Sequence, residues 1–274
     1  MKKLIVIADW ASDSMNFQEF RSAVEGYVEN PNGINVNFVT STPSTIDTGY
    51  ILNQIVATEE RLGRPMETVI FQNTDTRLNQ KNKADEAQGE DFFIIKLKSG
   101  LLVCGPNSGY DFSFIKDRID EIFKYTGLDK GSQFRSRDLY ARVSAHLMDE
   151  LEDEMDLEET NSDSILSMKG FYVGHIDNHG NIKTTMRLSE LREKYEFGDL
   201  VKISMNHVTK EAKFVKNLFG GQPGELVIYP GSSGKFDDPY LEISVWRYFT
   251  EENPTTGFHE FHFPKAGAKI EILK

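Results

Sequence analysis

Three short apolar runs alternate with two helical patterns in the first 71 residues of the 274-residue chain, and this order restricts the fold more than any other feature. The runs have the length and continuity of strands that are covered on both faces. Between them, aromatic and aliphatic residues recur every three or four positions, as on the buried side of an amphipathic helix. The order predicts an α/β domain with a largely parallel sheet. The apolar runs are 4–8, 36–39 and 68–71, and the helical patterns are 17–27 and 45–62.

Further elements complete this first domain. A polar stretch without periodicity, 74–91, predicts a loop. The apolar runs 92–97 and 101–104 flank a Lys-Ser-Gly turn and predict a β-hairpin. Helical spacing of apolar residues predicts one helix over 112–123 and another from about 138 towards 155.

The character of the chain changes near residue 160. Residues 149–160 hold many acids and no Lys or Arg, which indicates a solvated helix end followed by a linker. Beyond them, short strand-like runs are separated by Gly, Asn, Asp and Pro, as in antiparallel β structure. We therefore expect an α/β domain at 1–160 and a smaller antiparallel all-β domain at 168–274. The predicted strands of the second domain are 171–176, 201–205, 212–215, 226–229, 241–246 and 270–273.

Charge and cysteine content exclude several classes of function. The chain carries 31 basic and 43 acidic residues, for a formal net charge of −12. Such an acidic chain is poorly suited to grip a phosphate backbone, so we expect no nucleic-acid partner. Cys104 is the only cysteine, which excludes intrachain disulfides and multi-cysteine metal sites. The run at 4–8 is too short for a membrane span or a signal segment, so we expect a cytoplasmic protein without membrane contact.

Candidate site residues lie where apolar runs end. Asp9 follows the first run and Asn73 the third, and ligands of parallel sheets bind at the carboxyl ends of the strands. The carboxylate of Asp9 can hold the two hydroxyls of a ribose, although the same residue could equally be a helix N-cap. The sequence has no P-loop and no G-x-G-x-x-G segment after the first run, which disfavours ATP-driven and Rossmann dinucleotide chemistry.

Two weaker motifs lie in the second half. His175 and His179 flank Asp177, but no third ligand is close in sequence, so we expect structural histidines and no metal site. The segment 231–234, Gly-Ser-Ser-Gly, is typical of a tight turn between strands. Neither motif identifies a function by itself.

Taken in chain order, several segments resemble the S-adenosyl-L-methionine (SAM) hydroxide adenosyltransferases, or SAM hydrolases, with the related fluorinase and chlorinase. Segments of the first half are similar to the family's Thr-Asp-Phe-Gly-x-x-Asp, Pro-Asp-Asn-Gly, Phe-His-Gly-Arg-Asp and Ala-Ala-His-Leu. Segments of the second half are similar to its His-Ile-Asp-x-Phe-Gly-Asn, Gly-Glu-Leu, Ser-Ser-Gly and Leu-Glu-Ile-Ala. Each motif is short, but the ordered set covers nearly the whole chain. The segments are 4–13, 105–109, 134–138, 143–147, 173–181, 223–226, 231–234 and 241–245.

The resemblance implies a two-domain fold that assembles as a homotrimer and binds SAM between the first domain of one subunit and the second domain of a neighbour. SAM is then the substrate or ligand, and no metal or redox cofactor is needed. By position, Asp9 would hold the ribose hydroxyls and Phe134 would border the ribose and the reacting carbon. Residues of the second domain would hold the methionine end and the adenine edge; these are Asp177 with Ser232 or Ser233, and Asn181, respectively.

The sequence departs from the resembled family at an Asp-Arg-His set that positions or activates water. Asn73 stands where the family has its Asp, and Asp75 and Arg77 lie close by at a different spacing. Arg135 replaces the His, and Ser136 replaces a Gly at a position where the fluorinase has a serine that donates to the halide. An Arg–Ser pair suits an anion, and it equally suits a protein that has lost water activation. The candidate catalytic residues are therefore Asp75, Arg77, Arg135 and Ser136, and Asn73 is grouped with the binding residues.

Three functions are consistent with these motifs. The first is cleavage of SAM to adenosine and L-methionine, with water or hydroxide attacking C5′. The second is a non-catalytic protein that binds SAM or adenosine, and the third is SAM-dependent displacement by another anion such as halide. The altered Asp-Arg-His set adds weight to the second hypothesis.

Overall fold

The computed structural model of the chain describes residues 1–75, 90–128, 132–246 and 255–273. The chain forms two compact units, Met1–Ser167 and Met168–Lys274. Each unit has its own hydrophobic core.

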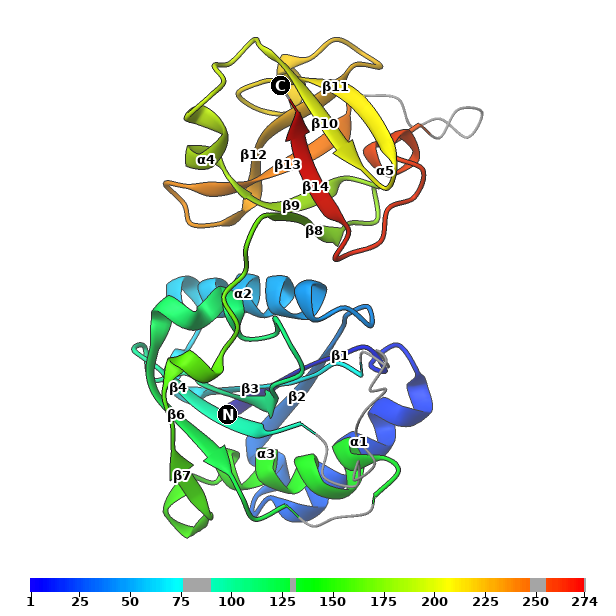
Figure 1. Cartoon of the computed structure of the whole chain (residues 1–274). Helices are drawn as coiled ribbons and strands as arrows, with labels where there is room; N and C mark the ends of the chain where they lie inside the picture. Colours follow the sequence, from blue (N-terminus) through cyan, green and yellow to red (C-terminus); the bar gives the residue numbers. More distant parts are fainter. Residues whose placement is uncertain (76–89, 129–131, 247–254, 274) are drawn as a thin grey trace, which may run out of the picture. The chain divides into compact units, whose positions relative to one another are not determined.

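In the described residues, the first unit is a seven-stranded mixed sheet with helices on both faces, which confirms the predicted α/β class. The strand order is β2-β1-β3-β5-β4-β6-β7. The first four strands of this order are parallel, and the remaining three pair antiparallel with their neighbours. Figure 1 shows α2 on one face of the sheet and α1 and α3 on the other. The elements are β1 (Lys2–Ala8), α1 (Ser14–Tyr27), β2 (Ile34–Thr40), α2 (Thr45–Leu62), β3 (Thr68–Asn73), β4 (Phe92–Leu97), β5 (Leu102–Pro106), β6 (Ile119–Tyr125), α3 (Ala141–Met148) and β7 (Leu157–Glu159).

The continuous apolar run of β1 follows from burial on both sides of the sheet. Leu4 and Val6 belong to the core that contains α1 and α3, whereas Ile5 and Ile7 belong to the core that contains α2. All four side chains are 6% exposed or less. Successive side chains of a strand point to opposite faces, so a polar residue would be buried at every one of these positions. The first acid after the strand, Asp9, comes where the covered part of the sheet ends.

The prediction of a helix over 112–123 is wrong. Ser113–Arg118 forms a short 3₁₀ helix, and Ile119–Tyr125 forms strand β6. The 3₁₀ turn followed by a strand buries Phe112, Ile115 and Ile122 at intervals that resemble those of a helix face. The outer edge of β4 supplies the pairing partner for β6, and a local pattern does not reveal such a partner.

The helix predicted from 138 towards 155 is shorter than expected. A π-helical turn, Ser136–Tyr140, leads into α3, which ends at Met148. The helix stops there because Glu150 has a φ of 62°, in the left-handed region. The acidic segment 149–160, expected to be a solvated helix end and linker, includes strand β7 at the edge of the sheet.

In the described residues, the second unit is a closed barrel with the strand order β10-β11-β12-β13-β9-β8-β14. Neighbouring strands are antiparallel, except for a short parallel pairing of β11 with β12. This confirms the predicted antiparallel β class, although the sequence did not predict β9. The elements are β8 (Phe171–Ile176), β9 (Ile182–Arg187), α4 (Leu188–Arg192), β10 (Leu200–Met205), β11 (Val208–Phe214), β12 (Leu226–Gly234), β13 (Pro239–Val245), α5 (Gly257–Glu260) and β14 (Lys269–Leu273).

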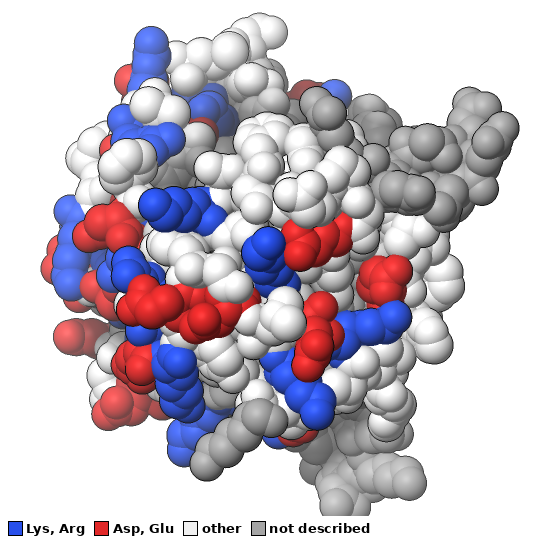
Figure 2. All heavy atoms as spheres, turned by 90° about the horizontal axis from the view of Figure 1, so that it is seen from above, with Lys and Arg blue, Asp and Glu red and all other residues white. Residues whose placement is uncertain are grey.

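The surface carries charges of both signs. On the face drawn in Figure 2, basic and acidic side chains are interspersed. No helix within the described ranges is long and apolar enough to cross a membrane.

Candidate functional site

The carboxyl ends of the parallel strands in the first unit bring two predicted site residues together. β1 ends at Ala8 and β3 ends at Asn73, and these two residues are partners in the parallel register. Asp9 therefore follows β1 beside the end of β3. Its Oδ2 accepts a hydrogen bond of 3.0 Å from the backbone N–H of Asp75. The sequence-based expectation that both strand ends contribute to one polar edge thus agrees with the geometry.

Asp9 is not the N-cap of α1, the helix that follows it. Asp13 is the N-cap of this helix, and its Oδ1 accepts hydrogen bonds from the backbone N–H groups of Met15 and Asn16. Asp9 lies four residues earlier and does not cap the helix. Its carboxylate is therefore available for another partner.

The environment of Asp9 is unfavourable to its charge. Partial burial raises the pKa of Asp9 above its usual value, and the nearby charge of Asp75 adds to this rise. The hydrogen bond from the Asp75 amide works in the opposite direction. A carboxylate held in this state gains from any ligand that donates hydrogen bonds to it.

Asn73 and Ser136 form the second contact at this edge. The Nδ2 group of Asn73 donates a hydrogen bond of 2.7 Å to Oγ of Ser136. Ser136 is buried in the π-helical turn that leads into α3. The ring of Phe134 packs edge-on against Trp10, with 5.6 Å between ring centroids. The segment before α3 is thereby joined to the ends of both β1 and β3.

The other predicted catalytic residues are more loosely connected to this edge. Asp75 is exposed, and its backbone amide and its charge both act on Asp9. The side chain of Arg135 hydrogen-bonds to Tyr140, whose pKa is raised by burial. Arg77 lies outside the described residues.

The same edge holds a buried acid that the sequence did not predict as a site residue. Asp111 is fully buried, and its Oδ2 accepts a hydrogen bond of 3.0 Å from the backbone N–H of Ser108. Its Oδ1 has no hydrogen-bond partner in the described part of the chain. Burial raises the pKa of Asp111 well above its usual value, and the charge of Asp9 raises it further. The available signal was an acid between two aromatic residues, Tyr110 and Phe112.

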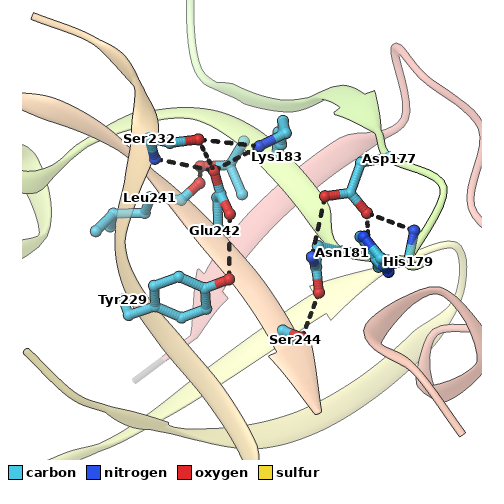
Figure 3. Close-up of polar contacts among 10 residues, drawn as sticks. Asp177, His179, Asn181, Lys183, Tyr229, Ser232, Leu241, Glu242 and Ser244 are labelled. Carbon is cyan, nitrogen blue, oxygen red and sulfur yellow. Dashed lines mark hydrogen bonds and ion pairs between the residues drawn. The ribbon is translucent and has the colours of Figure 1, made fainter. Parts of the chain in front are cut away.

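In the second unit, Asp177 organises the turn between β8 and β9. Its Oδ1 accepts from the backbone N–H groups of His179 and Asn181, at 2.9 and 3.0 Å, and its Oδ2 accepts from the Asn181 side-chain amide at 3.0 Å. Oδ1 of Asn181 in turn accepts from the hydroxyl of Ser244 on β13 (Figure 3). The part of the chain that the structure describes holds no group of three acids, histidines or cysteines able to bind a metal ion. His175 and His179 are therefore not joined there by a third metal ligand.

The Gly-Ser-Ser-Gly segment is not the turn between two strands that the sequence predicts. It lies inside β12, where the register against β13 shifts between Pro230 and Gly234. The segment is a β-bulge, because the β12 side has more residues than the β13 side between these two pairs. The bulge places Ser232 against Glu242 of β13 (Figure 3).

The predicted binding residues thus form separate groups, each within its own unit. Asp9, Asn73, Phe134 and Ser136 gather at one edge of the first sheet. Asp177 and Asn181 form one polar group of the barrel, and Ser232 belongs to another. Ser233 is buried in the bulge beside it.

The chain shares its fold and part of its sequence with known proteins, although no family model matches it. It is 30% identical over 166 residues to the (R)-S-adenosyl-L-methionine hydrolase of Methanocaldococcus jannaschii. The alignment covers 55% of this chain and 57% of that protein, so the chain spans little more than half the length of this curated relative. This similarity makes the two proteins distant relatives.

Two solved structures extend the likeness to the whole chain. An uncharacterized conserved protein from Thermotoga maritima has a TM-score of 0.71 and 19% identity, with 99% of this chain and 100% of that chain covered. A conserved hypothetical protein from Thermus thermophilus has a TM-score of 0.63 and 15% identity, with full coverage of both chains. At these identities, the likeness establishes the fold alone.

Proposed function

From the distant relationship to a SAM hydrolase, we propose that this protein binds SAM and cleaves it to adenosine and L-methionine, with water or hydroxide attacking C5′. The observation that carries the proposal is the carboxylate of Asp9 at the end of β1. It is held on one oxygen by the Asp75 amide, it is not used as a helix cap, and burial raises its pKa. A pair of ribose hydroxyls would supply further hydrogen-bond donors to this carboxylate.

The residues around Asp9 suit the nucleoside end of the ligand. The ring of Phe134 can border the ribose and the reacting carbon, because its contact with Trp10 holds it beside the end of β1. Asn73 can contribute its amide to the same end of the sheet. In the proposed arrangement, these groups hold the ribose so that C5′ faces the nucleophile.

The barrel supplies the proposed groups for the remaining parts of the ligand. Asp177 would bind the methionine ammonium group, and a serine of the bulge, Ser232 or Ser233, would bind the carboxylate. Asn181 would bind the adenine edge, with its amide oriented by Asp177 and Ser244. Because these groups and Asp9 lie in different units, we also propose a homotrimer in which each site is shared between neighbouring subunits.

The chemistry needs little from the protein beyond placement and exclusion of water. SAM carries a positive sulfonium, and methionine leaves from C5′ as a neutral thioether. An anionic nucleophile that attacks this cation loses charge in the transition state, so a site that strips water from the nucleophile favours the step. In-line placement of the nucleophile supplies much of the remaining acceleration.

The proposed catalytic residues are Asp75, Arg77, Arg135 and Ser136, and they include no evident base for neutral pH. Asn73 cannot accept a proton, and the arginines are permanently charged. Asp75 is exposed to solvent, and its proposed role is to orient water. The rate of hydrolysis should therefore rise with pH if hydroxide itself is the nucleophile.

A non-catalytic SAM-binding protein is the second candidate, and one contact favours it. The Asn73 amide and the Ser136 hydroxyl bind each other at 2.7 Å, so the place where a water-activating carboxylate is expected is filled by a neutral hydrogen-bonded pair. Such a pair can line a binding site without taking a proton.

The decisive experiment is incubation of the pure protein with SAM, followed by chromatography of the products. We expect adenosine and methionine in equal amounts, released faster at high pH. Matched controls are the Asn73→Asp, Arg135→His double variant, which restores the resembled family's residue types, and reactions with added halide. A parent that binds SAM but releases no adenosine at any pH, while the double variant does, would establish the binding protein instead. A halogenated nucleoside would establish the third hypothesis.

A further inference from the structure

A buried ion pair in the barrel lies directly against the bulge of β12. Glu242 on β13 and Lys183 on β9 are 2.7 Å apart, and their side chains are only 6% and 15% exposed. Neither residue was singled out from the sequence. The cost of burying two charges is high unless further hydrogen bonds satisfy them, so the remaining contacts of the pair decide what it does.

Each oxygen of Glu242 has a distinct set of donors (Figure 3). Oε1 accepts from Lys183 Nζ, from the backbone N–H of Ser232 at 3.1 Å and from the Ser232 hydroxyl at 3.3 Å. Oε2 accepts from the hydroxyl of Tyr229 at 3.1 Å. Lys183 Nζ also donates to the Ser232 hydroxyl at 3.4 Å. Both polar groups of Ser232 are therefore held by the ion pair.

The backbone of the bulge is shaped to allow this contact. A Cβ atom on Gly231 would lie 2.4 Å from Cγ and 2.5 Å from Oε1 of Glu242, far inside van der Waals contact. Only glycine lets the chain approach the carboxylate so closely. The segment around the serines thus accommodates Glu242, rather than merely reversing the chain direction.

A purely structural explanation of the pair is weak on energetic grounds. Apolar side chains of similar volume often replace a buried ion pair without loss of stability, so stability alone does not require Glu242 and Lys183. What apolar residues cannot supply is an acceptor for the amide and hydroxyl of Ser232. The pair consequently fixes the conformation of one particular segment.

We propose that Glu242, charge-paired with Lys183, is a positioning residue that holds the bulge in the conformation that receives the amino-acid end of SAM. This inference rests on the proposed function. Loss of the pair should affect binding of the amino-acid end of SAM and not of the nucleoside end. The pair contacts the bulge, whereas Asp9 lies at the edge of the first sheet.

The experiment compares two ligands in titration calorimetry on the full-length protein. SAM has the amino-acid end, whereas 5′-methylthioadenosine lacks it and keeps the nucleoside. In the Lys183→Met, Glu242→Leu double variant, both charges leave together and Ser232 loses its acceptor. We expect SAM to bind roughly tenfold more weakly, because the displaced bulge loses about one hydrogen bond to the ligand. Binding of 5′-methylthioadenosine should be unchanged.

Two further variants make the result specific. Glu242→Gln keeps an acceptor for the Ser232 amide and should retain most of the SAM affinity. Lys269→Met, Glu271→Leu removes an exposed ion pair of the same barrel and should change neither affinity. The proposal is overturned if the Lys183, Glu242 double variant binds SAM as the parent does, or if it loses both ligands equally.

Hydrogen exchange at the Ser232 amide tests the positioning without any ligand. The Lys183→Met, Glu242→Leu variant should exchange this amide faster than the parent, and Glu242→Gln should not. If the parent binds neither ligand, the proposed function fails, and the exchange rates still decide whether the pair holds the bulge. Equal exchange in all three proteins would overturn the positioning role.

Discussion

Asp111 in the first unit and Glu242 in the second are both buried carboxylates, with 0% and 5% of the residue exposed. Glu242 has a lysine within 2.7 Å and donors on both oxygens. Asp111 accepts a hydrogen bond from the backbone N–H of Ser108, and its other oxygen has no hydrogen-bond partner in the described residues. The charge of Asp9 lies nearby. In the described residues, both oxygens of Glu242 therefore have donors, whereas one oxygen of Asp111 has no hydrogen-bond partner.

The two carboxylates therefore differ in what they can still bind. Both oxygens of Glu242 already accept hydrogen bonds, whereas one oxygen of Asp111 can accept another. A fully satisfied network fixes one conformation, as the pair of Glu242 and Lys183 does for the bulge of β12. Acids that lack partners raise the free energy of the folded protein, and ligand donors can recover part of this cost. We therefore expect removal of one member of the barrel pair to destabilise the second unit. Loss of Asp9 should instead weaken binding and leave stability nearly unchanged.

The largest expected effect is on the stability of the barrel. Lys183→Met removes the cation and leaves Glu242 buried without its charge partner, which should lower the free energy of unfolding by about 3–5 kcal/mol. Chemical denaturation followed by the fluorescence of Trp246 reports on the second unit once Trp10, the other tryptophan, is replaced by Phe. Lys269→Met, which opens an exposed pair, is the matched control and should cost little. Equal losses in the two variants would contradict a structural role of the buried pair.

A smaller effect is expected at the sheet edge, and on binding instead of stability. Asp9→Ala should weaken SAM binding by roughly tenfold to a hundredfold, the range for losing a charge-assisted contact to a diol. Its unfolding curve should stay close to that of the parent, since the variant removes a carboxylate whose charge burial disfavours.

Asp13→Ala provides the opposite pattern as a control for Asp9. This residue caps α1, so its loss should cost about 1 kcal/mol of stability and leave SAM affinity unchanged. Titration calorimetry and denaturation are both measured on each variant. If Asp9→Ala binds SAM as the parent does, Asp9 is not part of the site.

The parts of the fold that the sequence predicted well depend on local patterns. The apolar run of β1 and the helix over 45–62 follow directly from burial on two faces and on one face, respectively. Asp9 could be named as a candidate because the end of a parallel strand can be located from the local sequence pattern, without knowledge of distant contacts. Local pattern and tertiary structure agree at these places.

The parts that could not be predicted depend on partners far away in sequence. Strand β6 forms because β4 offers it an edge, and the bulge of β12 depends on the acid that β13 directs against it. The role of Lys183 appears only when the fold brings it beside Glu242, which is 59 positions away in the chain. The unsatisfied oxygen of Asp111 is likewise a property of its surroundings, since nothing in its local sequence shows which groups face each oxygen in the described residues.

The raised pKa of Asp111 makes the stability of the first unit depend on pH. Because burial raises its pKa, the folded protein holds this proton more tightly than the unfolded chain does. Above the unfolded pKa of about 3.9, the unfolded chain releases the proton first, so the free energy of unfolding falls as pH rises through the window up to the raised folded pKa. One proton can contribute a slope of at most about 1.4 kcal/mol per pH unit.

Asp111→Asn keeps the shape and an acceptor for the Ser108 amide but cannot ionise, so it should lack this part of the slope. Denaturation at a series of pH values, followed by Trp10 with Trp246 replaced by Phe, measures the first unit alone. The difference between variant and parent is the informative quantity, because Asp138, whose pKa is lowered by Arg137, changes stability in the opposite direction. The variant should gain stability relative to the parent as pH rises. A constant difference across pH would mean that Asp111 has the same pKa in the folded and the unfolded chain. Burial would then carry no penalty for the charge of Asp111, which would contradict its contrast with Glu242.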